Sequence, residues 1–125
     1  MPSVGDMPRI NDYSLCKDSV TVYHFENGVV TSAYFPKAYF EFTETQKVDK
    51  VGASEEDTFL LVVPGSSKAC SVGDKVLLGE GEQPGNDHAA FWRSLIPTQV
   101  DNLGVVRKVF LGRWRGEIVH TEARG

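Results

Sequence analysis

The segment Asp57–Glu82 constrains the fold more than any other part of the sequence. It contains a near-continuous apolar run, Phe59–Val63, which ends at the turn-forming pair Pro64-Gly65. A second short apolar run, Val76–Leu78, follows Gly73-Asp74. Short apolar runs separated by Gly and Pro are typical of strands in a β-barrel or β-sandwich. Because the segment carries no catalytic motif, it favours a protein that assembles with other components over one with a reactive pocket.

The region before this segment predicts a hairpin and then a bent strand. Val20–Phe25 is rich in β-branched and aromatic residues, which favour strands. Asn27-Gly28 follows and predicts a type I′ turn, because both central positions of that turn need positive φ. Val29–Phe35 is then the partner strand. Pro36 marks an edge, a bulge or a bend, after which the alternation resumes in Ala38–Thr43.

The last forty or so residues predict one short helix and two strands. Asn86–Leu95 is the helical candidate, since Asn86 or Asp87 can cap its start and its apolar residues are spaced for one helix face. Val105–Leu111 and Arg113–Thr121 are expected to form a hairpin around Gly112. The whole pattern indicates a mostly β fold, an antiparallel barrel or sandwich of six to seven strands with one short helix near residues 86–95.

The length of 125 residues fits one domain. We expect a flexible N-terminal arm over residues 1–12, where Pro, Gly and Asp occur without periodicity, and a single β domain over residues 13–125. Residues 44–57 form a long polar loop, and a loop of this length in a compact domain is usually functional or mobile. Its charged residues are candidates for contacts in an assembly or a channel: Lys47, Asp49, Lys50, Glu55 and Glu56.

Charge is distributed unevenly along the chain, whose formal net charge is −4. Residues 1–67 hold five basic and ten acidic side chains, whereas residues 68–125 hold eight and seven. Between Gly104 and Gly116 there are cations and no acid, and these cations are candidates for contact with DNA or a partner protein: Arg107, Lys108, Arg113 and Arg115. The competing interpretation is a solvated outer face of a strand.

Alternation along the predicted strand Arg113–Thr121 puts Arg113, Arg115 and Glu117 on its outer face and Trp114 in the core. Binding of single-stranded nucleic acid requires outward aromatic side chains between the cations. The predicted burial of Trp114 therefore disfavours that function.

The sequence contains no recognisable catalytic, metal-binding or cofactor-binding pattern. Gly79–Gly85 is glycine-rich, but its two glutamates would repel a phosphate. His120 and Glu122 would share one strand face without a third metal ligand. Cys16 and Cys70 fit no metal or redox spacing, so we expect two reduced thiols in a cytoplasmic product, with a disulfide as the alternative. We expect no enzymatic activity, no cofactor and no membrane-spanning segment, since no apolar run reaches about 20 residues.

Three segments carry a resemblance to a known family. The strand Phe59–Pro64, the segment Val72–Glu80 with its G-D-x-V-x-x-G pattern, and Gly104–Val109 with its G-V-V start occur in this order. This order resembles that of small minor-capsid and neck proteins of tailed bacteriophages and prophages of Gram-positive hosts. The ending Arg113–His120 also looks like the terminal strand of that group, and the similarity covers most of residues 18–122.

The resemblance implies a virion structural protein. It implies a head–tail connector or head-completion (stopper-like) subunit, which forms a ring between portal and tail and guides or retains DNA. The implied partners are copies of the chain itself, portal or adaptor proteins, tail proteins and, as a further candidate, double-stranded DNA in a channel. The implied location is the neck of the virion, after synthesis in the host cytoplasm.

Two alternatives remain open at this point. One is a capsid decoration protein on the exterior of the shell. The other is a β-barrel module that binds nucleic acid or peptide, whose binding would weaken with salt and with loss of Arg113 and Arg115.

Overall fold

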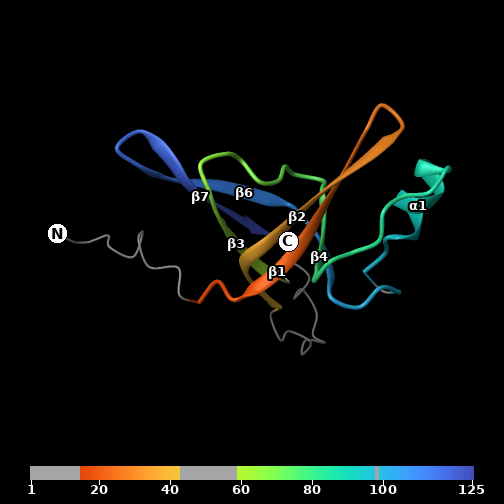
Figure 1. The fold of residues 1–125 in the computed structure, drawn as a ribbon, viewed down its shortest axis with the longest axis horizontal. Coiled ribbons are helices and arrows are strands. Elements are labelled where there is room, and N and C mark those ends of the chain that lie inside the picture. Colours follow the sequence, from red (N-terminus) through yellow and green to blue (C-terminus); the bar gives the residue numbers. More distant parts are fainter. Residues whose placement is uncertain (1–14, 43–58, 98) are drawn as a thin grey trace, which may run out of the picture.

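The computed structural model describes residues 15–42, 59–97 and 99–125. In chain order the elements are β1 (Asp18–Glu26), β2 (Val29–Phe42), β3 (Phe59–Pro64), β4 (Lys75–Leu78), α1 (His88–Ser94), β5 (Leu103–Val105), β6 (Lys108–Trp114) and β7 (Glu117–Arg124). The strand pairings in these residues are antiparallel and give one sheet of order β5-β4-β1-β2-β3-β7-β6. The sheet curls into a half-barrel (Figure 1). The predicted mostly β fold with one short helix is confirmed.

Two sequence predictions lie outside the described residues. These are the N-terminal arm at residues 1–12 and the polar loop at residues 44–57, which includes the candidate contact residues Lys47, Asp49, Lys50, Glu55 and Glu56.

The first hairpin forms as predicted. Asn27 and Gly28 have φ of 55° and 78°, the two positive values that a type I′ turn requires. Glu26 pairs with Val29 across this turn, and the register continues along β1 and β2. The hairpin extends beyond the rest of the sheet at the upper right of Figure 1.

β2 bends at the predicted position. Val20 pairs with Phe35 and Asp18 pairs with Ala38, so β2 has one more residue than β1 between the two pairs. This β-bulge contains Pro36, which has no backbone N–H to donate to a neighbouring strand. Before the bulge β2 pairs with β1, and from Tyr39 onward it pairs with β3. β2 therefore joins the two halves of the curled sheet.

The main core fills the concave face of the half-barrel. Alternate residues of each strand point into it, as Val20 and Val22 of β1 and Phe59, Leu61 and Val63 of β3 show. Its remaining buried members are Ala38, Phe40, Cys70, Val76, Val106 and Ala123.

A second core lies between α1 and the convex face of β1 and β4. Tyr23 meets Phe91 edge-on with ring centroids 5.4 Å apart, and Phe25 stacks on Trp92 at 5.3 Å. Its buried members are Tyr23, Val30, Leu95 and Leu103. Because β1 has a core on each face, the four consecutive residues Val20–Tyr23 are all buried.

Helix α1 is shorter than predicted. It covers His88–Ser94, and the Asp87 carboxylate accepts a hydrogen bond from the backbone N–H of Ala90 at 3.0 Å. The expected cap at Asp87 is confirmed. Lys75 ties the end of the helix to β4, because its ammonium donates to the carbonyls of Trp92 (3.0 Å) and Leu95 (2.7 Å).

The predicted C-terminal hairpin forms, but the prediction of its turn at Gly112 is wrong. The turn between β6 and β7 is Arg115-Gly116, with φ of 55° and 84°, so a non-glycine residue occupies the first left-handed position. Gly112 lies within β6 and serves packing: a Cβ built there would be 2.2 Å from a ring atom of His120. The sequence signal of Gly112 was thus a packing signal and not a turn signal.

The predicted strand Val105–Leu111 is divided into β5 and β6. The division occurs at Val106 and Arg107, whose backbone N–H groups donate to the backbone carbonyls of Asp74 (2.9 Å) and Arg124 (2.8 Å) respectively. The first bond lies beside the β4–β5 pair and the second beside the β6–β7 pair, so the chain passes here from one edge of the sheet to the other.

Candidate functional site

The tip of the β6–β7 hairpin is exposed. Residues Arg113 to Glu117 are all exposed, and the tip projects beyond the sheet at the upper left of Figure 1. Trp114 is 47% exposed, and the guanidinium carbon of Arg115 lies 5.5 Å from the centroid of its ring. We call Arg113, Trp114 and Arg115 the basic tip.

The predicted burial of Trp114 is wrong. Because the turn is at Arg115-Gly116, Trp114 pairs with Glu117 at the end of the hairpin and Arg113 pairs with Ile118. A bulge between Gly112 and Arg113 precedes these pairs. Alternation predicts the core only for a strand that stays within the sheet, and this end of β6 extends past it.

The four cations singled out in the sequence do not form one cluster. Lys108 begins β6 and Arg113 is near its end, so the two are about 16 Å apart along the strand at about 3.3 Å per residue. Arg107 lies next to Lys108 at the base, and Arg115 is at the tip. The structure therefore brings together Arg113 and Arg115, and it separates them from Arg107 and Lys108.

The base of the hairpin has a shallow cleft of about 300 Å³, lined by Lys108, Phe110, Glu122 and Arg124. Arg124 donates to Glu122 at 2.8 Å, which offsets part of the positive charge. Phe110 is 53% exposed. The outer face of β6 thus presents two exposed aromatic rings, Phe110 and Trp114, among cations, a composition enriched in interface hot spots.

The segments between β4, α1 and β5 carry acidic side chains. The loop after β4 runs toward α1 and holds exposed Glu80 and Glu82, while α1 begins after exposed Asp87 and β5 after exposed Asp101. We call these four residues the acidic strip. Leu78, at the start of this loop, is 37% exposed.

The loop is held against β1 by specific hydrogen bonds. The Thr21 hydroxyl donates to the Gly79 carbonyl at 2.8 Å and accepts from the Gly81 N–H at 2.9 Å. The Tyr23 hydroxyl donates to the Glu82 carbonyl at 2.8 Å. A Cβ at Gly81 would lie 1.9 Å from the Tyr23 hydroxyl oxygen, so only glycine allows this approach. The backbone that carries Glu80 and Glu82 is therefore fixed.

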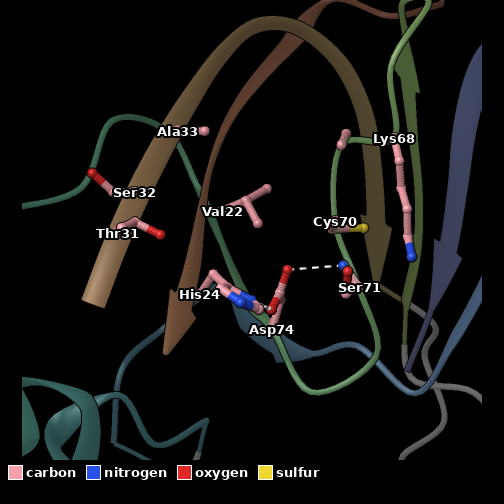
Figure 2. Close-up of a pocket in the computed structure, with 10 residues that line it drawn as sticks. Val22, His24, Thr31, Ser32, Ala33, Lys68, Cys70, Ser71 and Asp74 are labelled. Atoms are coloured by element: carbon pink, nitrogen blue, oxygen red, sulfur yellow. Dashed lines mark hydrogen bonds and ion pairs between the residues drawn. The ribbon is translucent and has the colours of Figure 1, made fainter. Parts of the chain in front are cut away.

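A cleft of about 280 Å³ lies between the β1–β2 hairpin and residues 68–74 (Figure 2). In it the His24 ring is held between two carboxylates. Its Nδ1 is 2.5 Å from an oxygen of Asp74, and its Nε2 is 3.1 Å from an oxygen of Glu26. The other oxygen of Asp74 accepts from the Ser71 N–H at 2.8 Å. Because carboxylates only accept, both ring nitrogens donate, and the geometry fits the imidazolium form.

The hydrogen bond to Asp74 is the largest cause that raises the pKa of His24, followed by the bond to Glu26. Sequence analysis missed this group because the two residues are 50 positions apart. Gly73-Asp74 was interpreted only as the start of a strand. With both ring nitrogens engaged, His24 has no free nitrogen to activate a nucleophile.

The thiol in the same cleft is unreactive. Burial raises the pKa of Cys70 to about 12, so the thiolate is not populated near neutral pH. Its sulfur points away from His24 (Figure 2). Cys16 and Cys70 are both free and buried, so the expectation of two unpaired thiols is confirmed.

Residues 15–42, 59–97 and 99–125 contain no group of three or more His, Cys, Asp or Glu side chains that could hold a metal ion. Within the same residues no helix has the length and apolar character needed to cross a membrane.

Comparisons with protein families, with curated proteins and with solved structures give no match to this chain.

Proposed function

We propose that this chain is a structural subunit of a bacteriophage virion, a head–tail connector or stopper-like protein that forms a ring between portal and tail. The observation that carries the proposal is the difference between two separate surfaces of the molecule. The basic tip projects at the upper left of Figure 1, and the acidic strip lies away from it, on the segments between β4, α1 and β5. Two unlike and complementary surfaces favour head-to-tail contacts, which close into a ring when the rotation between copies allows it.

The placement in the neck of a virion rests on the resemblance of Phe59–Pro64, Val72–Glu80 and Gly104–Val109 to small phage neck proteins. The geometry supports the assembly part of the proposal. Exposed aromatic and arginine side chains at a hairpin tip suit a protein contact, and the His24 cleft lacks an activated nucleophile. The proposed partners are further copies of the chain, portal or adaptor proteins and tail proteins.

Electron microscopy of purified particles tests the proposal. An antibody raised against the purified chain labels it in the particles, and the expected label is at the single vertex that joins head and tail. Label spread over the shell lattice would instead identify a decoration protein. A chain that is missing from the particles would exclude both virion roles.

A second candidate function, binding of single-stranded nucleic acid, gains support from one observation. Phe110 and Trp114 are exposed between cations, the arrangement that stacking of bases requires. This candidate predicts salt-dependent binding of an oligonucleotide that is lost in the double variant Arg113→Ala plus Arg115→Ala. Binding that is unchanged in the double variant would exclude this face.

A further inference from the structure

We propose that the basic tip of one copy docks on the acidic strip of a second copy, with Trp114 packed against Leu78 of that copy. This inference rests on the proposed function, because it names the two surfaces that would make the head-to-tail contact. It also assigns a role to Trp114, whose ring is exposed and belongs to neither core.

The donor surface has one apolar anchor between two cations. Trp114 supplies a large ring that is 47% exposed, and Arg113 and Arg115 flank it in the chain. The type I′ turn at Arg115-Gly116 makes the tip narrow and fixes its backbone. A narrow and preorganised tip loses little conformational entropy when it binds.

The acceptor surface has the inverse pattern, one apolar residue between two acids. Leu78 is 37% exposed, and Glu80 follows it by two residues. The backbone N–H of Leu78 donates to the carbonyl of Asn102 at 3.0 Å, which places the neighbouring Asp101 beside the end of β4. Trp114 with its arginines therefore matches Leu78 with its acids in both charge and polarity.

The position of the two surfaces allows two kinds of contact. The basic tip projects at the upper left of Figure 1, away from β4, at whose end Leu78 lies. In a two-fold dimer each tip would contact the strip of the other copy, so both tips and both strips would be occupied. The proposed ring requires the other arrangement, a heterologous contact that leaves one free tip and one free strip for further copies.

A second copy fits the basic tip better than a nucleic acid does. The guanidinium of Arg115 lies over the Trp114 ring at 5.5 Å, on a surface that a stacked base would need. Docking on the acidic strip of a second copy does not require an uncovered face of the Trp114 ring.

A charge-exchange experiment tests the inference. Variant one carries Arg113→Glu and Arg115→Glu, and variant two carries Glu80→Lys and Asp101→Lys. Each variant alone juxtaposes like charges, so its self-association, measured by sedimentation, should weaken by about tenfold or more relative to the unmodified chain. In an equal mixture every tip meets a strip of opposite charge, so association should return as alternating copies of the two variants.

A matched control exchanges two exposed cations elsewhere. Lys68→Glu plus Arg107→Glu changes the net charge as variant one does, but at residues outside both surfaces. This control should associate like the unmodified chain. Circular dichroism of all variants confirms that each is folded.

The outcomes separate the two proposals. Failure of the mixture to restore association overturns the inference, as does an unmodified chain that stays monomeric or a tip that binds an oligonucleotide in place of a second copy. The location of the chain in particles is measured independently, so a neck protein with a different contact surface would retain the proposed function and lose the inference.

Discussion

The two halves of the curled sheet differ in what covers their convex faces. On β1 and β4 this face is buried under α1, and Tyr23 is 1% exposed there. On β6 the corresponding face has no helix over it in the described part of the chain, and Phe110 is 53% exposed. The half under α1 therefore contributes to the stability of the subunit, whereas the other half presents exposed apolar surface of the kind that marks an interaction site.

The largest expected effect is on the covered half. Tyr23→Ala removes a buried ring, its contact with Phe91 and its hydrogen bond to the Glu82 carbonyl, so the free energy of unfolding should fall by about 3 kcal/mol or more. Phe110→Ala, on the uncovered half, should change it by less than about 0.5 kcal/mol. Denaturation with urea measures both. Equal losses would show that the two halves do not differ as described.

A smaller effect is expected at the attachment of α1. Lys75→Met keeps most of the side-chain volume but removes two hydrogen bonds to the end of the helix and the cation that lies 4.3 Å from the Trp92 ring centroid. The loss should be about 1–2 kcal/mol. In Lys75→Met the amide hydrogens of α1 should exchange faster than in the unmodified chain, whereas those of β3 should not. Uniform acceleration over the whole chain would contradict a local attachment.

A pH dependence is expected from the His24 cleft. The folded-state pKa of His24 is raised, so its stabilising effect is complete below about 6.5, the unfolded value, and is lost as pH rises through the folded value. Because the side chain is 42% exposed, solvent screens the interaction and the effect should stay below about 1 kcal/mol. Melting temperatures measured from pH 6 upward, in about 0.5-unit steps, should fall in the unmodified chain and not in His24→Gln. Parallel curves for the two proteins would exclude this histidine as the cause.

The smallest effect on stability is expected at the basic tip. Trp114→Ala should leave the free energy of unfolding within about 0.5 kcal/mol, since the ring is half exposed. The same variant should lose self-association, which light scattering measures. Arg107→Ala, at the base of the hairpin, is the matched control and should keep it. A large loss of stability in Trp114→Ala would mean that the ring serves the fold.

The sequence predicted those parts of the fold that depend on local chemistry. Asn27-Gly28 fixed the first turn, Pro36 marked the bulge, and Asp87 capped α1, because each of these residues acts on its own backbone. The second hairpin was misplaced at Gly112, since a glycine required by the ring of His120 looks the same in sequence as one required by a turn.

The candidate site was predictable only in part. Arg113 and Arg115 were found as cations, but their separation from Lys108 depends on strand length and turn position. The exposure of Trp114 was missed, because alternation does not show where a strand leaves the sheet. The acidic strip joins residues from separate loops, and the pairing that brings Asp101 beside β4 is visible only in the folded chain.

The most direct test of the contact between the basic tip and the acidic strip is a disulfide cross-link between copies. Chains with Trp114→Cys and chains with Leu78→Cys are mixed and oxidised gently, and the native Cys16 and Cys70 do not interfere because both are buried. We predict a covalent dimer that forms mainly in the mixture and joins position 114 of one copy to position 78 of the other, as mass spectrometry of the linked peptides would show. Dimers that form equally well in Trp114→Cys alone, or no cross-link in the mixture, would contradict the account.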